Sequence, residues 1–382
     1  MDFLEIYNSK LCSAEEAVKL VKDGDWVDYS QTCSFPQLLD AALAKRSGEL
    51  HDVKIRNAIA MVPVQTVEND PAGSFTYNAW HCSGVDRRYV DKGLAYHTPM
   101  LFRHCGTYYK KGYAPVNVAM ITVAPMDENG NLSFGLTNCA MQELLDCAEH
   151  IILEVNPSMP VIAGIANDHI NICDVDCVVE SDLPIPTVKS PSATELDRRI
   201  AEHIFPYITS GCCLQLGIGG MPNALGELLA ESELRELGMH TQLCSDAYYA
   251  LWKAGKLTNE GKSLFLGKGV LGLAIGSRAL YDWLDNNSNI IAAPLSYVNR
   301  METIAANDRL ISINGCLNVD LYGQTASESA GTRQISGTGG QLDFVSGAVL
   351  SKGGRAVRRP PSSPNTARRS SPGAAPGSAP SA

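Results

Sequence analysis

Short apolar runs alternate with segments of helical periodicity along the first 180 residues. Ser13-Ala14-Glu15-Glu16 is a capping box and predicts a helix over AEEAVKLVKDG, ended by Gly24. DWVDYS predicts a strand and FPQLLDAALAKRSGEL a helix. The Val/Ile/Met-rich runs VKIRNAIAMVP and VNVAMITVAPMD are typical of strands buried on both faces. DENGNLSFG has the turn chemistry of a hairpin, and AMQELLDCAEHIILEVNPSMP predicts a helix running into a strand.

A second series of the same kind follows a Pro-rich segment, Pro184 to Pro191, which predicts a linker. CCLQLGIGGMPNALGELLAES predicts a strand, a Gly-rich turn and a helix, and GMHTQLCSDAYYALWKAG and SLFLGKGVLGLAIGSRALYDWL repeat the alternation. Such alternation indicates an α/β fold with largely parallel sheets. We therefore expect two α/β domains, at residues 1–190 and 191–354.

The last segment, RAVRRPPSSPNTARRSSPGAAPGSAPSA, has no aromatic residue and no acid. It predicts a disordered basic Pro/Ser/Ala-rich tail over 355–382, because it offers too little apolar surface to offset ordering. It could be an interaction tail or an extension without function. The abrupt change of composition at Gly354 also suggests a frameshift or truncation that leaves the second domain incomplete.

Composition narrows the class of protein. The chain has 382 residues, is 45% hydrophobic and carries a net charge of −10, which favours a globular protein and disfavours a nucleic-acid partner. No window approaches the 18–20 apolar residues of a membrane span, and the N-terminus lacks a secretion signal, so a cytoplasmic location is expected. The 12 cysteines are scattered, as expected for reduced thiols. Cys173 and Cys177 lack a second Cys/His pair at zinc spacing and there is no HExxH, so no metal site is predicted.

Two Gly-rich loops could present backbone N–H groups to an anion. In LQLGIGGMPNALG, Gly217, Gly219 and Gly220 leave a predicted strand and Pro222 falls in the first turn of a predicted helix. The spacing is not GxGxxG, which disfavours a dinucleotide site and leaves a phosphate, carboxylate or oxyanion, or a plain turn. In SGTGGQLDFVSGA, Gly337, Gly339 and Gly340 precede a strand-like LDFV; this loop too could stabilise negative charge, or be a tight turn.

Three other stretches carry candidate side chains. In HTQLCSD, His240 and Cys244 would share a face of a strand and could form a Cys-His pair, whereas Asp246 is more typical of a helix N-cap. Glu328 lies among small residues and could be a nucleophile or a structural contact. The segment 102–117, FRHCGTYYKKGYAPVN, could recognise an acidic substrate or a nucleotide, or be a solvated loop.

Taken in order, five segments resemble class I CoA-transferases of the acetyl-CoA hydrolase/transferase family, the branch with 4-hydroxybutyrate and butyryl-CoA:acetate CoA-transferases. They are HTPMLFRHCGTYYKKG, LQLGIGGMPNALG, GMHTQLCSDAYYALWKAGKLT, INGCLNVDLYGQTASESAG and ISGTGGQLDFVSGAVLSKGG, and the resemblance spans residues 1 to 354. It implies two Rossmann-like α/β domains. It also implies transfer of coenzyme A between an acyl-CoA and a short-chain carboxylate such as acetate, butyrate or 4-hydroxybutyrate. The resemblance implies that this reaction proceeds through glutamyl anhydride and glutamyl-CoA intermediates. We therefore expect coenzyme A as a substrate and no permanently bound cofactor. We also expect no nucleic-acid or membrane partner, and a homo-oligomer that is a dimer or a tetramer.

The resemblance also assigns residues. It implies that Gly217, Gly219, Gly220, Met221, Pro222, Gly339 and Gly340 line the oxyanion and CoA site, with Lys352 and Arg355 as candidates for the CoA phosphates. The family pattern H-[ST]-E-x-x-[ST]-D is matched from His240 to Asp246, but Gln242 occupies the position of the nucleophilic glutamate. An amide cannot form the anhydride, so impaired transfer is predicted. An acyl-CoA hydrolase and a non-catalytic CoA-binding protein remain alternatives, and a nucleotide-binding oxidoreductase is disfavoured.

Overall fold

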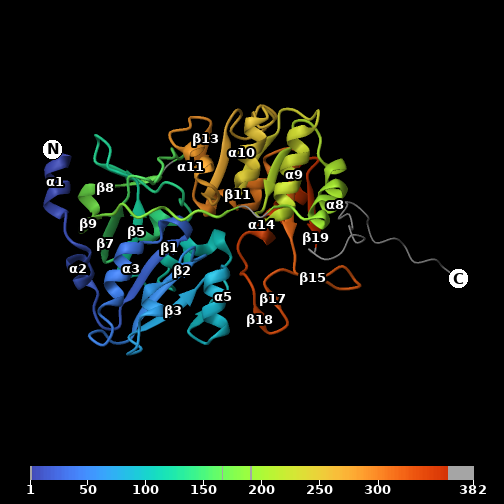
Figure 1. The fold of residues 1–382 in the computed structure, drawn as a ribbon. Coiled ribbons are helices and arrows are strands. Elements are labelled where there is room, and N and C mark those ends of the chain that lie inside the picture. Colours follow the sequence, from blue (N-terminus) through green and yellow to red (C-terminus); the bar gives the residue numbers. More distant parts are fainter. Residues whose placement is uncertain (1, 166, 190–191, 360–382) are drawn as a thin grey trace.

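A parallel sheet forms the centre of the first half of the chain (Figure 1). The computed structural model describes residues 2–165, 167–189 and 192–359, and within these ranges the sheet has seven strands, every adjacent pair parallel. In spatial order they are β4 (Ala95–His97), β3 (Phe75–Ala79), β2 (Val53–Ala58), β1 (Trp26–Gln31), β5 (Val118–Val123), β7 (His150–Val155) and β9 (Cys177–Glu180). The predicted hairpin is present: β6 (Asn131–Ser133) turns back toward Met126 through Gly130 and also pairs with β8 (His169–Asn171).

Alternating residues of these strands enter two different hydrophobic clusters. Val118 and Met120 of β5 belong to one cluster, whereas Ala119 and Ile121 belong to the other. Both faces of the sheet are therefore covered, which explains the unbroken apolar runs of the sequence. The helices of this half are α1 (Phe3–Lys10), α2 (Ala14–Ala17), α3 (Gln37–Ala44), α4 (Gln65–Glu68), α5 (Gly84–Asp91), α6 (Cys105–Lys110) and α7 (Met141–Leu145), with 3₁₀ turns η1 (Val18–Leu20), η2 (Thr32–Ser34), η3 (Phe102–His104) and η4 (Ile172–Asp174).

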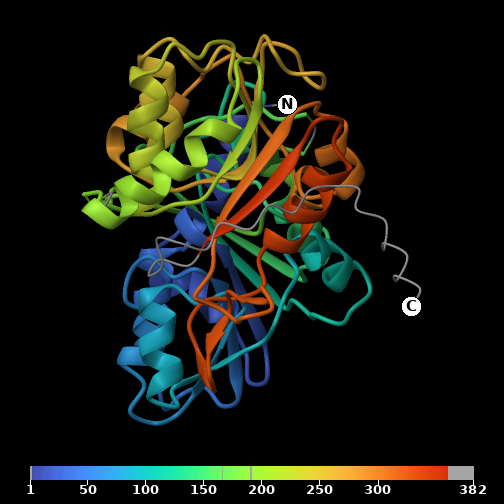
Figure 2. The ribbon, with the colours of Figure 1, turned by 90° about the vertical axis from the view of Figure 1, so that its right-hand side faces the viewer.

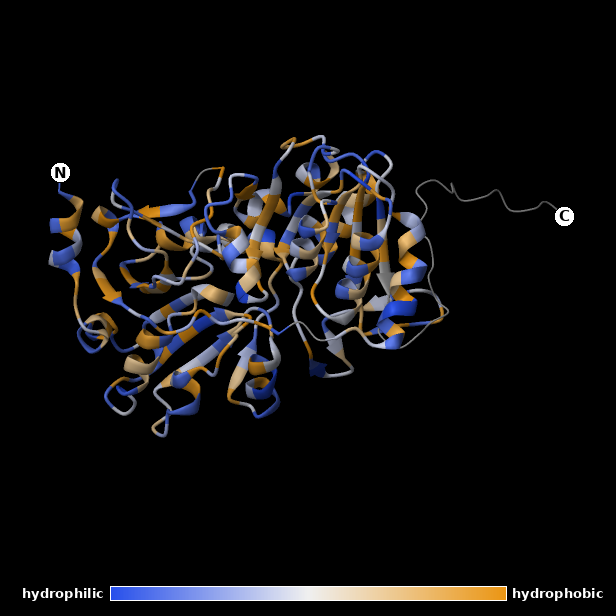
Figure 3. Ribbon diagram, turned by 45° about the horizontal axis from the view of Figure 1, so that its top comes forward, coloured by the Kyte–Doolittle hydropathy of each residue, from blue (hydrophilic) through white to orange (hydrophobic). Residues whose placement is uncertain are grey.

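The second half repeats this plan with a six-stranded parallel sheet among its described residues. Hydrophobic residues recur along the strands of both halves (Figure 3). The strands are β13 (Ile290–Ala292), β12 (Gly269–Ala274), β11 (Gly238–Cys244), β10 (Cys213–Leu216), β14 (Leu310–Gly315) and β19 (Arg355–Arg359). The helices are α8 (Glu195–Ile204), α9 (Gly220–Glu231), α10 (Asp246–Lys253), α11 (Arg278–Leu284), α12 (Leu295–Val298), α13 (Met301–Ala305) and α14 (Gln341–Leu350), with η5 (Phe205–Tyr207). The α/β fold class with two largely parallel sheets is confirmed.

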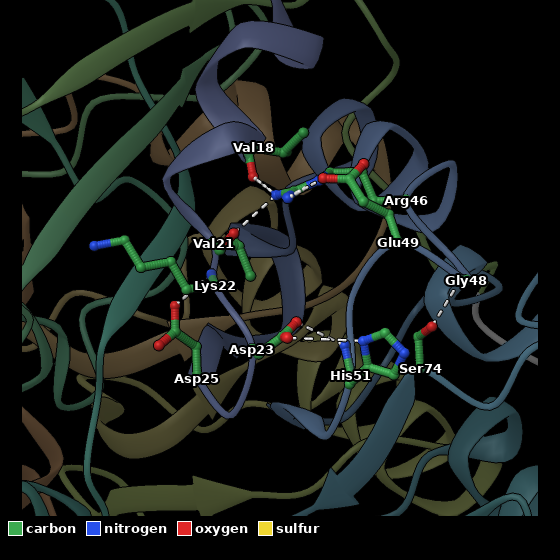
Figure 4. Close-up of polar contacts among 10 residues, drawn as sticks. All are labelled: Val18, Val21, Lys22, Asp23, Asp25, Arg46, Gly48, Glu49, His51 and Ser74. Atoms are coloured by element: carbon green, nitrogen blue, oxygen red, sulfur yellow. Dashed lines mark hydrogen bonds and ion pairs between the residues drawn. The ribbon is translucent and has the colours of Figure 1, made fainter.

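The first predicted helix is shorter than the sequence pattern indicates. The Ser13–Glu16 capping box is present, but α2 ends at Ala17 and the chain continues as η1. Arg46 stabilises this tight turn, because its guanidinium donates to the carbonyls of Val18 and Val21 while it also binds Glu49 (Figure 4). The helix therefore stops before Gly24, the stop signal in the sequence.

The strand expected over LDFV is wrong, because these residues lie in α14. Phe344, Gly347 and Ala348 are buried at helical spacing, and Gly347 packs directly on Ile304 of α13. A four-residue apolar run does not distinguish a strand from a buried helix, and packing against α13 decides for the helix.

The tail was expected to begin at residue 355, but Arg355–Arg359 form β19. This strand pairs with β14 over its whole length, from Ile311–Arg355 to Gly315–Arg359, and buries Ala356. Backbone pairing with a neighbouring strand outweighs the weak strand propensity of an Arg-rich segment. Residues 360–382, the rest of the predicted tail, lie outside the described residues.

The two halves are joined closely between their sheets. Tyr281 of α11 donates to the carbonyl of Pro186 in the predicted linker, and Thr137 forms an antiparallel bridge with Leu273 of β12. The strands of the first sheet precede residue 181 and those of the second follow residue 212. The boundary at residue 190 itself stays a prediction.

One segment of the second half returns to the first. After β14, the chain forms two short hairpins and extends down beside α5 before it enters α14 (Figure 2). The hairpin strands are β15 (Asn318–Val319), β16 (Thr325–Ala326), β17 (Ser329–Ala330) and β18 (Arg333–Gln334). This excursion carries Gly339 and Gly340 to the boundary between the halves.

Candidate functional site

Gln242 lies near the carboxyl end of β11, at the edge where ligands of open parallel sheets usually bind. Its side chain is half-buried, and its Oε1 accepts a hydrogen bond of 2.6 Å from Nδ2 of Asn299, the residue that ends α12. The geometry thus places a hydrogen-bond donor against the oxygen of this side chain.

Gly340 directly contacts both Gln242 and Asn299. A methyl group built on Gly340 would collide with Gln242 Oε1 and with Asn299 Nδ2, so any other residue here would force these side chains to move. Gly340 precedes the first turn of α14, where backbone N–H groups are unpaired within the helix. Two segments 98 residues apart that the family resemblance singled out, at Gln242 and Gly340, therefore meet in space.

The preceding residue is held by the first half of the chain. Gly339 has φ +53°, a left-handed conformation that glycine adopts without strain, and its carbonyl accepts a 3.0 Å hydrogen bond from the N–H of Phe102. His81 packs on the same loop, and a methyl group on Gly337 would lie 2.7 Å from its Nδ1. The site is consequently built from both halves.

The first Gly-rich loop lies at the neighbouring strand end. β10, which is adjacent to β11, ends at Leu216, and α9 begins at Gly220 after Gly219 at φ +120°. Around Gly217 and Gly219 a methyl group would meet nothing within 4 Å, so their backbone is open to a ligand. Ser245, just after β11, donates to the carbonyl of Gly217 at 3.4 Å and ties this loop to the end of β11.

Met221 and Pro222 occupy the first turn of α9, Pro222 being buried. Proline has no N–H, and the first-turn N–H groups need no helical partner, so the proline is compatible with this position. Gly220 faces Asp197 of α8, whose carboxylate accepts from the backbone and hydroxyl of Thr194. The N-terminus of this twelve-residue helix offers the kind of dipole and N–H donors that favour anions.

His240 and Cys244 do not form a catalytic pair. His240 is buried against Phe344, with Nε2 at 2.9 Å from the carbonyl oxygen of Val298, and desolvation lowers its pKa to about 3. Cys244 lies in a different hydrophobic cluster, where burial raises the pKa of its thiol. A neutral imidazole and a protonated thiol in separate surroundings are structural groups.

Asp246 is also structural, but not as the predicted N-cap. The N-cap of α10 is Ser245, and Asp246 is the first residue of the helix. Its carboxylate accepts from the backbone N–H and the hydroxyl of Ser277, at the start of α11. Asp246 therefore connects the loops that follow β11 and β12.

The structure separates Lys352 and Arg355 from the rest of the predicted site. Lys352 follows α14, a ten-residue helix about 15 Å long, whereas Gly340 precedes it. The carbonyl of Lys352 accepts a hydrogen bond from the N–H of Arg309, which immediately precedes β14. Arg355 pairs with Ile311, at the beginning of β14. Both lie at the amino edge of the sheet, opposite Gln242, because parallel strands place all their carboxyl ends on one side.

Two further candidates have structural roles at the border of the site. Glu328 accepts a 2.9 Å hydrogen bond from the hydroxyl of Thr338 and thereby supports the Gly337–Gly340 loop. Within the segment 102–117, Phe102 contacts this loop, and the buried Tyr109 donates to Asp28. The segment is thus packed in part: residues 102, 105, 106, 109, 114 and 116 are buried, whereas eight of its sixteen residues are exposed.

Sequence patterns missed Asn299, His81 and the pairing of Arg103 with Asp343. Within the part of the chain that the structure describes, His81 Nδ1 has no hydrogen-bond partner, and desolvation lowers the pKa of His81 to about 4, so it is a neutral imidazole at pH 7. Arg103 Nη1 lies 3.2 Å from Oδ1 of the buried Asp343. No motif marks Asn299 or His81. The motifs that contain Arg103 and Asp343 do not reveal their pairing, since it arises only through contact between distant segments.

Across residues 2–165, 167–189 and 192–359, there is no group of three His, Cys, Asp or Glu side chains that could hold a metal ion. Among the helices in the same ranges, none has the length and apolar character needed to span a bilayer.

Comparisons with known proteins agree with this architecture. The model of the acetyl-CoA hydrolase/transferase N-terminal domain matches residues 1–189, and that of the corresponding C-terminal domain matches residues 276–372. The second match includes part of the segment beyond Gly354 that we expected to lie outside the resemblance.

Individual proteins are similar over most of the chain. A butyryl-CoA:acetate CoA-transferase of Anaerostipes caccae is 43% identical over 93% of this chain and 80% of its own length. A 4-hydroxybutyrate coenzyme A transferase of Clostridium kluyveri is 36% identical over 95% of this chain and 83% of its own. The crystal structure of RipA from Yersinia pestis has a TM-score of 0.86 and 30% identity, covering 94% of this chain and 83% of that one. This chain therefore belongs to the acetyl-CoA hydrolase/transferase family of CoA-transferases.

Proposed function

We propose that the chain binds an acyl-CoA and a short-chain carboxylate between its two halves, at Gln242, Gly340 and the Gly217–Gly220 loop. We further propose that its CoA transfer is impaired, because residue 242 is an amide. The observation that carries the proposal is the contact of Gln242 Oε1 with Asn299 Nδ2 at 2.6 Å, beside Gly340.

The surroundings of Gln242 suit a carboxylate. An oxygen of a glutamate at this position could accept the same hydrogen bond from Asn299, since it differs from Gln242 by one heavy atom. The half-buried setting leaves the side chain accessible to a thioester. The N–H groups at the start of α14 and α9 would be placed to stabilise an oxyanion and the phosphates of coenzyme A.

With a glutamate at 242, each chemical step would balance without a cofactor. The carboxylate attacks the thioester carbonyl, the C–S bond breaks, and an acyl-glutamyl anhydride and the CoA thiolate form. The thiolate then attacks the glutamyl carbonyl and releases the first carboxylate, leaving a glutamyl-CoA thioester. The acceptor carboxylate then attacks the glutamyl-CoA thioester, which gives a second anhydride and releases the CoA thiolate. The thiolate attacks the acyl carbonyl of that anhydride, which yields the new acyl-CoA and regenerates the glutamate. The neutral amide oxygen of Gln242 is a poor nucleophile and cannot give the anhydride.

The experiment compares the chain as given with Gln242→Glu. Transfer from butyryl-CoA to acetate is measured by product formation, and the covalent CoA adduct by mass spectrometry after incubation with acyl-CoA. We expect Gln242→Glu to gain several factors of ten in rate, each equivalent to about 1.4 kcal/mol of barrier, and to carry the adduct. Gln242→Met is the matched control, since it keeps the side-chain size without a carboxylate.

The outcomes separate the candidate functions. Equal transfer by the chain as given and by Gln242→Glu contradicts the impairment. Thiol release that is independent of acetate in Gln242→Glu favours an acyl-CoA hydrolase, the other activity in the family description. Binding of acyl-CoA without turnover in both forms favours a non-catalytic CoA-binding protein.

The acyl group is proposed from the relatives, which are named for butyrate, acetate and 4-hydroxybutyrate. A homo-oligomeric state and a cytoplasmic location are proposals of the same kind. Coenzyme A enters as a substrate, with no permanently bound cofactor needed for the steps above.

A further inference from the structure

The first half of the chain holds the segment 333–343 at several points, just before and at the start of α14. Asp91 pairs with Arg333 at 2.6 Å, and Arg87 donates to the carbonyl of Ile335. Farther along, backbone N–H groups of the first half donate to Ser336 and Gly339. The last contact is the ion pair between Arg103 and Asp343.

Among these contacts, the Arg103–Asp343 pair is the buried one. The Asp343 side chain is 1% exposed, that of Arg103 23%, and Arg103 Nη1 lies 3.2 Å from Asp343 Oδ1. Neither carboxylate oxygen has a hydrogen bond of ordinary geometry among the described residues. Desolvation raises the pKa of Asp343 to about 7, and the charge of Arg103 opposes this rise. Removal of Arg103 therefore leaves the Asp343 carboxyl buried without its charge partner, which is costly, whereas removal of Asp343 leaves Arg103 with partial access to water.

The location of the pair connects it to the site. Asp343 is in the first turn of α14, three residues after Gly340. A shift of Asp343 would therefore move Gly340 with it, because both belong to the same helical turn. Arg103 follows Phe102, whose N–H already holds Gly339. The two contacts therefore fix one short stretch of chain, and Gly340 in that stretch touches the side chain at 242.

We propose that Arg103 and Asp343 are positioning residues for CoA transfer. Their ion pair joins the two halves and holds the start of α14, with its N–H groups and Gly340, against residue 242. This inference rests on the proposed function of that site.

The Arg333–Asp91 pair provides a matched control. It joins the same two halves and restrains the same segment, but its side chains are 58% and 33% exposed. Exposed ion pairs contribute little, because water screens them and two long side chains must be ordered. If mere attachment of the segment mattered, loss of either pair would have the same effect.

Kinetics are measured in the Gln242→Glu background for Asp343→Asn, Arg103→Gln, the double variant and Arg333→Gln. We expect kcat to fall about tenfold to a hundredfold in the first two, as for a small misplacement of a reacting group, with a smaller change in KM for acyl-CoA. The double variant should be no slower than the slower single variant, because both disrupt one interaction. Arg333→Gln should stay close to the Gln242→Glu parent.

A second measurement does not depend on activity. Hydrogen–deuterium exchange should become faster for the amides of residues 339–344 in Asp343→Asn and Arg103→Gln, and not in Arg333→Gln. If the pair contributes only to stability, its loss lowers the thermal midpoint of unfolding but leaves kcat and the exchange of residues 339–344 unchanged. That result would overturn the proposal. A fall in kcat without faster exchange would overturn it as well.

The two proposals can fail separately. If Gln242→Glu shows no transfer, the proposed function fails, and the exchange measurement alone decides whether the pair positions α14. If Asp343→Asn does not fold, Arg103→Gln decides in its place, since Arg103 is the more exposed partner.

Discussion

At position 242, a single heavy atom separates the side chain present from the one that the family pattern implies. Asn299 can donate to either an amide or a carboxylate oxygen, so Gln242 and a glutamate fit the same surroundings. The difference is chemical, since only the carboxylate can form the anhydride. The fold should therefore tolerate Gln242→Glu while the reaction depends on it.

Gly340→Ala should disrupt the site without affecting the rest of the fold. The added methyl group would overlap Gln242 Oε1 and Asn299 Nδ2, and φ at this position is −117°, so the obstacle is steric rather than conformational. In the Gln242→Glu background we expect transfer to fall at least about tenfold, because misplacement of reacting groups by about 1 Å can cost a hundredfold. The measurement is kcat for transfer of CoA from butyryl-CoA to acetate.

Gly84→Ala is the control for that substitution, since a methyl group at the start of α5 would meet nothing within 4 Å. It should leave both stability and transfer unchanged. Full activity of Gly340→Ala would show that the overlap is relieved at no cost and would contradict the prediction.

His240→Phe should change the pH dependence of stability. Burial lowers the pKa of His240 from its usual 6.5 to about 3, so the folded chain resists protonation while the unfolded chain takes up a proton below pH 6.5. As the pH falls below 6.5, His240 therefore lowers the free energy of unfolding by about 1.4 kcal/mol per pH unit, which is roughly 2 kcal/mol between pH 6.5 and 5. The phenylalanine variant lacks this loss, and urea unfolding at pH 7 and pH 5 measures the difference.

Equal losses of unfolding free energy in the parent and in His240→Phe would refute the role assigned to this buried imidazole.

At the scale of elements, the close approach of α13 and α14 is the reason that LDFV is helical. Gly347 faces Ile304, and a methyl group on Gly347 would lie 2.5 Å from Ile304 Cγ2. Gly347→Ala should therefore destabilise the fold by about 1–3 kcal/mol through overpacking, although alanine is the better helix former. Chemical denaturation measures the change, and a stabilised variant would mean that propensity outweighs packing at this contact.

Local signals were sufficient for some elements and insufficient for others. The glycines after β10, together with Pro222, predict a strand, a turn and a helix, and all three are present. The capping box at Ser13 predicts the start of α2 correctly, but not its end, which depends on Arg46 from a distant part of the sequence. Strand β19 could not be predicted because its partner, β14, supplies the hydrogen bonds.

At the scale of the molecule, the hydrophobic clusters do not respect the division into halves. Cys33 and Leu136 of the first half share a cluster with α9 and α10, and Leu273 and Leu295 of the second half share one with β5 and β7. Separate α/β domains often unfold independently. The shared clusters predict instead a single cooperative transition.

The four tryptophans can report on this prediction, because Trp26 and Trp80 lie in the first half and Trp252 and Trp283 in the second. Replacing either pair by phenylalanine leaves fluorescence from one half. In each variant, the urea midpoint measured by fluorescence should equal the midpoint measured by circular dichroism. A fluorescence midpoint below that of circular dichroism in either variant would indicate independent unfolding of that half.

The sequence by itself determined the α/β class, the family and the identity of the residue at 242, because these depend on local periodicity, on ordered motifs and on side-chain chemistry. Only the tertiary structure decided which candidates form a site. It brings Gln242, Asn299 and Gly340 together, since strand ends and a returning segment converge at one edge of a sheet. It assigns Lys352 and Arg355 to the opposite edge, and Asp343 to a pair with Arg103. Contacts between residues far apart in the chain leave no local pattern, because each side chain is selected by a neighbour that only folding supplies.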